Sequence, residues 1–178
     1  MSPLDTIAFP VGHFPSGAFP DGHFPKLPSG TYTKYLLYSP AYILSRQLIT
    51  DSQVDEAYIS YDWPVYVSHL PDIDGNSACL YDTAPIVEKD LVLGLSDTKY
   101  GINISIRSLD YEEGRTKAQE LVDFLETLSN TTVEIGDCEY YIDTITNLSS
   151  YWYLGIDEKR KHFFSINLMM ILFLFEDA

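Results

Sequence analysis

The sequence predicts an α+β fold: a mostly antiparallel β-sheet with two helices packed on one face, plus an extended N-terminal arm. Three observations support this prediction. Patterns typical of a helix, of strands, of a second helix and of further strands follow one another along the chain. The 178 residues are 46% hydrophobic, which is enough for one domain with its own core. Residues 1–33 are rich in Pro and Gly and are too short to form a core, so we assign residues 1–33 to the arm and 34–178 to the domain.

The arm repeats a short unit of aromatic, proline and glycine residues. Each Phe-Pro-x-Gly suits a type I turn, and the prolines exclude a helix or a central strand. Phenylalanine is unusual in a flexible linker, where Gly and Ser dominate. We therefore expect an extended, polyproline-like arm with tight bends, which anchors in grooves of adjacent subunits or of a neighbouring ring. The anchors at five-residue intervals are Phe9, Phe14, Phe19 and Phe24.

The first helix is predicted to begin after Ser39. Serine is a favoured N-cap, and Pro40 stands where a first-turn proline is tolerated. Apolar residues then recur at near-helical spacing up to Leu48. Beyond Asp51 the segments "AYISYDWPVYVSHLP" and "SACLYDTAP" are β-branched and aromatic, with prolines between and within them, and predict short strands. The intervening "PDIDGNSA" predicts a turn.

The clearest strand is Tyr100–Asp110, where Ile102, Ile104 and Ile106 alternate with polar residues. It leads directly into "YEEGRTKAQELVDFLETLSN", whose apolar residues from Tyr111 onward fall on one helical face. This segment predicts the second helix.

The C-terminal third is predicted to return to strand. "TTVEI", "CEYYIDTITNL" and "YWYLGID" precede the turn "DEKRK" and the long run His162–Phe175. The last ten residues of that run show no alternation between apolar and polar residues. Such a strand is either central in the sheet or covered by a partner subunit.

The net charge of −15, from 26 acidic against 11 basic residues, argues against a grip on nucleic acid phosphates. An acidic surface still suits a passage through which DNA slides without sticking. The start of the chain has no basic region leading into an apolar stretch, and the longest apolar run is too short to cross a bilayer as a helix. We therefore expect a soluble protein with no membrane partner.

Catalytic and metal-binding patterns do not stand out. The four histidines lack the spacing of a zinc site, the two cysteines fit neither a disulfide framework nor a metal site, and "DIDGN" lacks the later glutamate of a calcium loop. Nucleophile elbows, phosphate-binding loops and dinucleotide fingerprints are missing. We predict a protein that is not an enzyme and that uses no cofactor or metal.

Aromatic residues make up 14% of the chain and gather in short clusters such as "YISYDW", "EYY" and "YWY". Strands favour aromatic residues, which explains any one cluster. Together with the apolar C-terminal strand and the aromatic arm, however, the clusters favour extensive protein–protein contact, because interface cores are enriched in these residues.

One series of motifs resembles the tail terminator and minor capsid proteins of long-tailed bacteriophages. In that family an Ile/Val-rich strand ends at an Arg, a helix follows, and a Leu-Gly-x-Asp…Arg…Phe-Ser-x-Asn stretch enters the last strand. The resemblance covers roughly residues 39–173, and "SPAYIL" and "WPVYV" match in order. The matching positions are Arg107, Tyr111, Leu154, Gly155, Asp157, Arg160, Phe164, Ser165 and Asn167.

The resemblance implies a structural virion protein that acts in the phage neck after assembly in the host cytoplasm. Such a protein forms a homo-oligomeric ring, typically a hexamer, which caps the tail tube, stops its polymerisation and joins it to the head–tail connector or stopper protein. Genomic DNA would pass through the lumen without specific binding. Besides the four arm phenylalanines, we expect contacts to subunits or neck partners from Arg107, Arg160, Phe164, Leu168, Met170 and Leu172.

Two alternatives stay open. A head–tail stopper or connector adaptor would differ from a terminator in stoichiometry and position in the particle. A sugar-binding or hydrolytic module of the virion would use the aromatic clusters as stacking platforms, and a well-formed pocket with a perturbed carboxylate would favour it.

Overall fold

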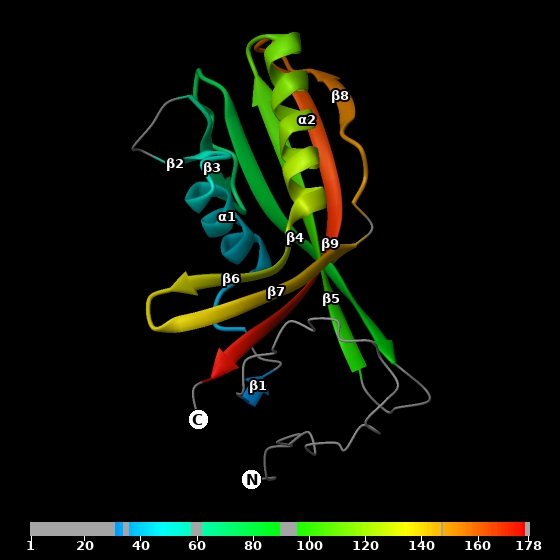
Figure 1. The fold of residues 1–178 in the computed structure, drawn as a ribbon. Coiled ribbons are helices and arrows are strands. Elements are labelled where there is room, and N and C mark those ends of the chain that lie inside the picture. Colours follow the sequence, from blue (N-terminus) through cyan, green and yellow to red (C-terminus); the bar gives the residue numbers. More distant parts are fainter. Residues whose placement is uncertain (1–30, 34–35, 58–61, 90–95, 147, 177–178) are drawn as a thin grey trace.

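The structure, a computed structural model, describes residues 31–33, 36–57, 62–89, 96–146 and 148–176. In this part of the chain the expected α+β architecture is confirmed: two helices accompany a curled, mostly antiparallel sheet (Figure 1). The four Phe-Pro units of the arm lie outside the described residues. The elements are β1 (Thr31–Thr33), α1 (Pro40–Thr50), β2 (Asp55–Glu56), β3 (Pro64–Val67), β4 (Ser77–Lys89), β5 (Ser96–Ser108), α2 (Tyr111–Thr127), β6 (Ser129–Ile135), β7 (Cys138–Thr146), β8 (Trp152–Ile156) and β9 (His162–Glu176).

The strands of the described chain form one sheet in the order β2-β3-β4-β5-β9-β7-β6, and β1 and β8 also pair with β9. Only the pairs β2–β3 and β3–β4 are parallel. One side of β9 pairs with β5 and, near its end, with β1; the other side pairs with β8 and then with β7. The long apolar run is thus a central strand, which was the first of the two expected alternatives.

Both helices pack on the same face of the sheet. Register partners in a sheet point to the same side. Phe164 of β9 opposes Ile106 of β5, which in turn opposes Ala78 of β4, and Asp82 lies two alternations further along β4 on the same side. Helix α1 contacts this face at Asp82, and α2 contacts it at Phe164.

Helix α1 begins where the sequence predicts. The Ser39 hydroxyl accepts a hydrogen bond from Tyr42 N at 3.2 Å, which satisfies one of the free amides of the first turn. A second amide, Ala41 N, donates to the Asp82 carboxylate at 2.8 Å. Asp82 comes from β4, so only the folded sheet supplies this second cap.

Helix α2 also begins at the predicted residue, and the Asp110 carboxylate caps it by accepting from Glu113 N at 3.0 Å. Gly114 in its first turn lets the helix lie against the sheet. A Cβ atom there would stand 2.6 Å from Cε2 of Phe164 and 2.8 Å from Cβ of Ser108. The absence of a side chain at residue 114 therefore sets how closely α2 approaches β9.

One strand runs further than the sequence suggested. We expected Pro85 to end the strand that contains "SACLYDTAP", but β4 continues to Lys89. The register between β4 and β5 shifts between Thr83 and Ile86. A bulge at this position accommodates the proline, which has no amide hydrogen to donate to the ladder.

Candidate assembly surface

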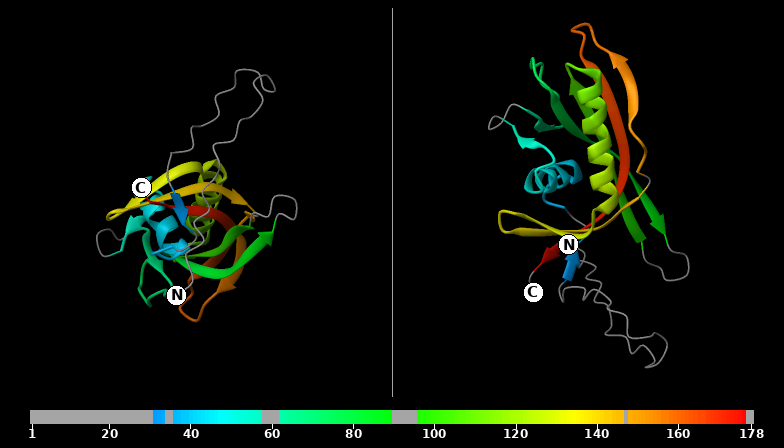
Figure 2. Two further views of the ribbon diagram at one scale, coloured as in Figure 1. Left: turned by 90° about the horizontal axis from the view of Figure 1, so that it is seen from below. Right: turned by 45° about the horizontal axis from the view of Figure 1, so that its top comes forward.

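Strand β8 forms an open edge of the sheet. It pairs with β9 alone, so its other side offers unpaired backbone amides and carbonyls among the described residues. In Figure 1 and in the right-hand view of Figure 2, β8 lies at the outer margin of the sheet, beside α2 and β9. Three of its side chains are large, apolar and mostly exposed: Trp152 at 63%, Leu154 at 65% and Ile156 at 57%. We call Trp152, Leu154 and Ile156 the β8 edge.

The backbone of β8 bends at its glycine. The register with β9 shifts between Tyr153 and Gly155, and Gly155 has a φ of 115°, which side chains with a Cβ rarely adopt. Leu154 is the additional residue of this bulge. Because of the bulge, Leu154 is turned out of the regular ladder, and the strand carries an apolar side chain at its open margin.

A group of aromatic rings covers the beginning of β9, between β8 and the start of α2. Tyr111 lies edge-on to Tyr153, with 5.1 Å between ring centroids, and 5.6 Å from the His162 ring. The Tyr153 hydroxyl and His162 Nδ1 are hydrogen-bonded at 3.0 Å. Tyr111, Tyr151 and Tyr153 surround the fully buried ring of Phe164 at centroid distances of 5.2–6.0 Å. We call Tyr111, Tyr151, Tyr153 and His162 the aromatic patch, of which Phe164 is the floor.

The patch combines exposed ring surface with polar groups at its rim. Tyr111 is 37% exposed and Tyr153 is 43% exposed. Arg115 lies one turn along α2, where Glu112 accepts a hydrogen bond from its Nε at 2.9 Å. The hydrogen bond with the Glu112 carboxylate is the main cause that raises the pKa of the Arg115 guanidinium, and a hydrogen bond with Tyr151 is the next. The surface therefore presents flat apolar rings with hydrogen-bonding groups around them.

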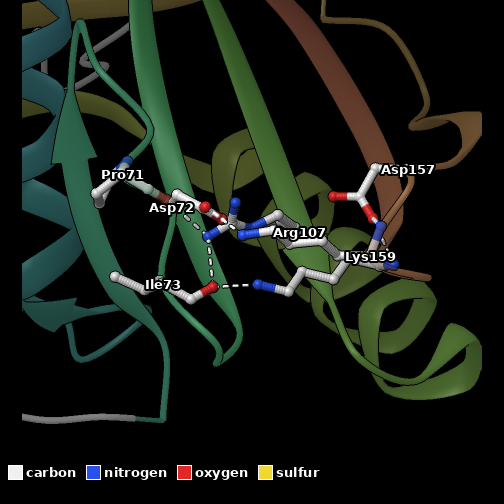
Figure 3. A network of polar contacts seen from close by, with 7 residues as sticks. Pro71, Asp72, Ile73, Arg107, Asp157 and Lys159 are labelled. Atoms are coloured by element: carbon white, nitrogen blue, oxygen red, sulfur yellow. Dashed lines mark hydrogen bonds and ion pairs between the residues drawn. The ribbon is translucent and has the colours of Figure 1, made fainter.

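A polar network around Arg107 fixes the loop that precedes β4 (Figure 3). Arg107 donates from one guanidinium nitrogen to the carbonyl oxygens of Pro71 at 2.8 Å and Ile73 at 3.0 Å. Lys161 also donates to the Ile73 carbonyl, and Lys159 pairs with Asp72. The loop thus obtains its hydrogen bonds from β5 and from the turn before β9.

The turn between β8 and β9 is fixed by its own first residue. The Asp157 carboxylate accepts from the backbone amides of Lys159 and Lys161, both at 2.8 Å. The Lys159 ammonium holds the pKa of Asp72 below its ordinary value through their hydrogen bond. Arg160, at the same turn, is exposed and has a φ of 61°. Of the two predicted contact arginines, Arg160 is at the surface, whereas Arg107 is only 5% exposed and holds the loop.

Four residues expected to contact partners have a different place in the structure. They lie on the helix-covered face of β9 and are at most 4% exposed, so their side chains are not available to a partner. The run is apolar because β9 is central and its inner face meets α2 and the rest of the core. The four residues are Phe164, Leu168, Met170 and Leu172.

The surface residues that the sequence did not single out are Tyr153, Trp152 and Ile156, although "YWY" stood out as an aromatic cluster. The glycine within the strand pattern "YWYLGID" could have indicated a bulge, because a glycine inside a strand often marks one. No local pattern indicated that Tyr111 would meet Tyr153, because the two lie 42 positions apart in the sequence.

A shallow depression of about 290 Å³ lies elsewhere, where Trp63 meets the first turns of α2. Three glutamates, Thr116 and Lys117 line it, and the Lys117 ammonium stands 5.9 Å from the Trp63 ring centroid. In the described part of the chain, no group of three or more His, Cys, Asp or Glu residues is placed to hold a metal ion. Likewise, no described helix is long and apolar enough to cross a membrane.

We compared the sequence with those of known proteins. The sequence matches no protein-family model and no curated protein sequence.

Proposed function

We propose that the protein is a structural subunit of a phage neck, a tail terminator that assembles into a ring. The observation that carries this proposal is the β8 edge, where an open strand margin coincides with three exposed apolar side chains. Open edges of this kind pair readily with another chain, and proteins that stay monomeric usually blunt them with charge or proline. The family resemblance of residues 39–173 supplies the biological setting.

The ring follows from head-to-tail contact between copies. The edge opposite β8 in the sheet order is β2, and four acidic residues lie on or near it, Asp51, Asp55, Glu56 and Asp62, of which Glu56 pairs with Arg46. The exposed Arg160 stands in the turn after β8. Contact between these two unlike edges is heterologous, and it closes into a ring when the rotation between copies divides a full turn. A hexamer is the state that the resemblance implies.

A closed ring ends a tube because its outer face offers no surface for another tube subunit. In this proposal one face of the ring meets the last ring of tail tube protein and the other meets the connector or stopper protein. The charge of −15 gives the lumen a surface that repels the DNA backbone and lets the genome pass. If reversal of lumen charges left the kinetics of DNA ejection unchanged, this role of the charge would be excluded.

The test is the mass of the purified full chain in solution, together with negative-stain imaging. We expect rings, and we expect Leu154→Lys with Ile156→Lys to shift the mass toward the monomer, because two ammonium groups would have to be buried at the contact. Ile86→Lys is the matched control, since Ile86 of β4 is also apolar and 44% exposed. A strict monomer at high concentration that binds no tail tubes would overturn the proposal. A ring found at the connector instead of the tube end would assign the stopper role.

A candidate location for the sugar-binding alternative is the depression at Trp63. An indole beside three carboxylates is a stacking platform with hydrogen-bond acceptors. Oligosaccharide-dependent quenching of Trp63 fluorescence in a Trp152→Phe background would favour it, and unchanged fluorescence at millimolar sugar would remove it.

A further inference from the structure

We infer that the aromatic patch binds a Phe-Pro-x-Gly unit from the N-terminal arm of a second copy of this chain. The occupant is residues 9–28, which lie outside the described residues, and the receiving surface is Tyr111, Tyr151, Tyr153 and His162. This inference rests on the self-association part of the proposed function, and it does not depend on the phage setting.

The chemistry of the patch fits a proline-rich segment. Proline-rich chains in the polyproline conformation dock on surfaces lined with aromatic rings, and their backbone carbonyls have no internal hydrogen-bond partners. The patch offers exposed faces of Tyr111 and Tyr153, with hydroxyl and guanidinium groups at the rim. A proline ring packs against such a face, and the neighbouring phenylalanine adds further apolar area.

The rigidity of the patch also suits binding. Its rings rest on Phe164, which is fully buried, and Tyr153 is held by its hydrogen bond to His162. Side chains that are already ordered lose little entropy when a ligand arrives. The surface is therefore prepared for an extended ligand.

The direction of the chain favours an arm from another copy. Strand β1 is antiparallel to β9, and Thr31 pairs with Glu176 whereas Thr33 pairs with Leu174. The chain before Thr31 thus leaves at the C-terminal end of β9, away from the patch at the other end of that strand (Figure 1). To reach the patch of its own chain, the arm would have to turn back along the molecule.

The arm is long enough for either route. The patch floor at Phe164 and the β1 partner Phe175 are eleven residues apart on β9, which corresponds to about 36 Å of strand. Thirty residues precede Thr31, and an extended polyproline chain of that length spans about 90 Å. Phe9 lies 22 residues before Thr31, so an extended arm carries this unit about 68 Å from β1, further than the length of strand that separates β1 from the patch.

Three Phe-Pro-x-Gly units, which begin at Phe9, Phe14 and Phe19, are nearly equivalent as ligands, whereas Phe24-Pro25 is followed by Lys-Leu. Because the three present the same pattern, any one of them can occupy a patch, and the others raise its local concentration there. This explains a repeat better than a single high-affinity motif would.

The test places a photo-reactive benzoyl-phenylalanine at Leu154 in the full chain. Leu154 is 65% exposed and is next to Tyr153 without belonging to the patch. Unlabelled protein and ¹⁵N-labelled protein are mixed before irradiation, and the cross-linked peptides are identified by mass spectrometry. We expect cross-links to peptides within residues 9–28, including pairs that combine labelled and unlabelled chains. The same probe at Ile86 is the control and should give few arm cross-links.

Two variants of the full chain test the residues. Tyr111→Ser with Tyr153→Ser removes the exposed rings, and replacement of all four arm phenylalanines by serine removes the anchors. Each should reduce the arm cross-links from residue 154 by about tenfold or more, as expected when an interface loses its central aromatic contacts. Circular dichroism of each variant checks that the fold is retained, and the arm variant, which alters no described residue, keeps the test valid if the tyrosine variant misfolds.

Several results would overturn the inference. Arm cross-links found only within isotopically pure pairs would show that the arm folds back on its own chain. Equal yields from residues 154 and 86, or an unchanged yield in the arm variant, would show that the patch does not select the arm. The mass of the same samples separates this outcome from failure of the proposed function: rings without arm cross-links refute only the arm contact, whereas a monomer refutes the ring.

Discussion

Replacement of Gly114 by alanine tests how closely α2 rests on the sheet. In an exposed helix, Gly→Ala stabilises by about 1 kcal/mol because alanine loses less backbone entropy on folding. Here the new Cβ would stand 2.6 Å from a carbon of the Phe164 ring and 2.8 Å from Cβ of Ser108. Both distances are shorter than any normal contact. Since Phe164 is fully buried, its ring cannot swing into solvent to make room.

The magnitude follows from these two opposing effects. Inserting a methyl group into a filled core costs about 1–3 kcal/mol, and because two contacts are violated we place the cost at the upper end, about 3 kcal/mol. After the helix-propensity gain of about 1 kcal/mol, the net loss is about 2 kcal/mol. For a chain of this length, that loss lowers Tm by about 4–8 °C.

The assay is urea denaturation followed by circular dichroism, with the free energy of unfolding compared between wild type and Gly114→Ala. Thr116→Ala on the exposed side of α2 is the matched control and should leave stability unchanged or slightly higher. In a Phe164→Leu background the alanine should cost less, because the smaller side chain gives space for the methyl group. If Gly114→Ala stabilises the protein by about 1 kcal/mol, the close approach of α2 to β9 is wrong.

Three further predictions concern stability. Arg107→Met should lower the free energy of unfolding by about 3 kcal/mol, because two charge-assisted hydrogen bonds to the loop before β4 are lost. Proteolysis within residues 71–76 should also increase, and unchanged cleavage would contradict the network. Burial raises the pKa of Tyr81 to about 12. The stability that the neutral Tyr81 hydroxyl contributes is therefore complete below pH 10 and is lost between pH 10 and about 12. Tyr81→Phe should reduce the decline of the free energy of unfolding in that window, and identical pH profiles of wild type and variant would refute the raised pKa. Asp110→Ala should lower the free energy of unfolding by about 1 kcal/mol in denaturant titrations. Asp110→Asn should retain most of the stability, because an amide oxygen can still accept from Glu113 N. Equal losses in the two variants would argue against the cap.

The patterns that the sequence carries locally were predicted correctly. Ser39 and the spacing that follows it define α1, and the apolar face that starts at Tyr111 defines α2, because capping and helical periodicity depend on residues within a few positions of one another. Alternation of isoleucine with polar residues defines β5 for the same reason. The boundaries were less secure: β5 begins four residues before the expected Tyr100, and β4 passes Pro85 through a bulge.

Contacts between distant segments could not be predicted in this way. The apolar run in β9, in which apolar and polar residues do not alternate, is equally consistent with a central strand and with a strand covered by a partner. Only its pairing with β5 and β7 shows that Phe164, Leu168, Met170 and Leu172 belong to the chain's own core. The second cap of α1 by Asp82 depends in the same way on where β4 lies.

The sequence by itself determined the class of fold, both helices and most of the strands; it did not indicate that residues 31–33, which we assigned to the arm, pair with β9 as β1. The tertiary structure decided which apolar residues are buried and which form a surface, since burial depends on the neighbours that each strand acquires. It places the β8 edge at an open margin, and it brings Tyr111 to Tyr153 and His162 over the buried ring of Phe164. Local sequence specifies the side chains, but only the folded sheet determines which of them meet.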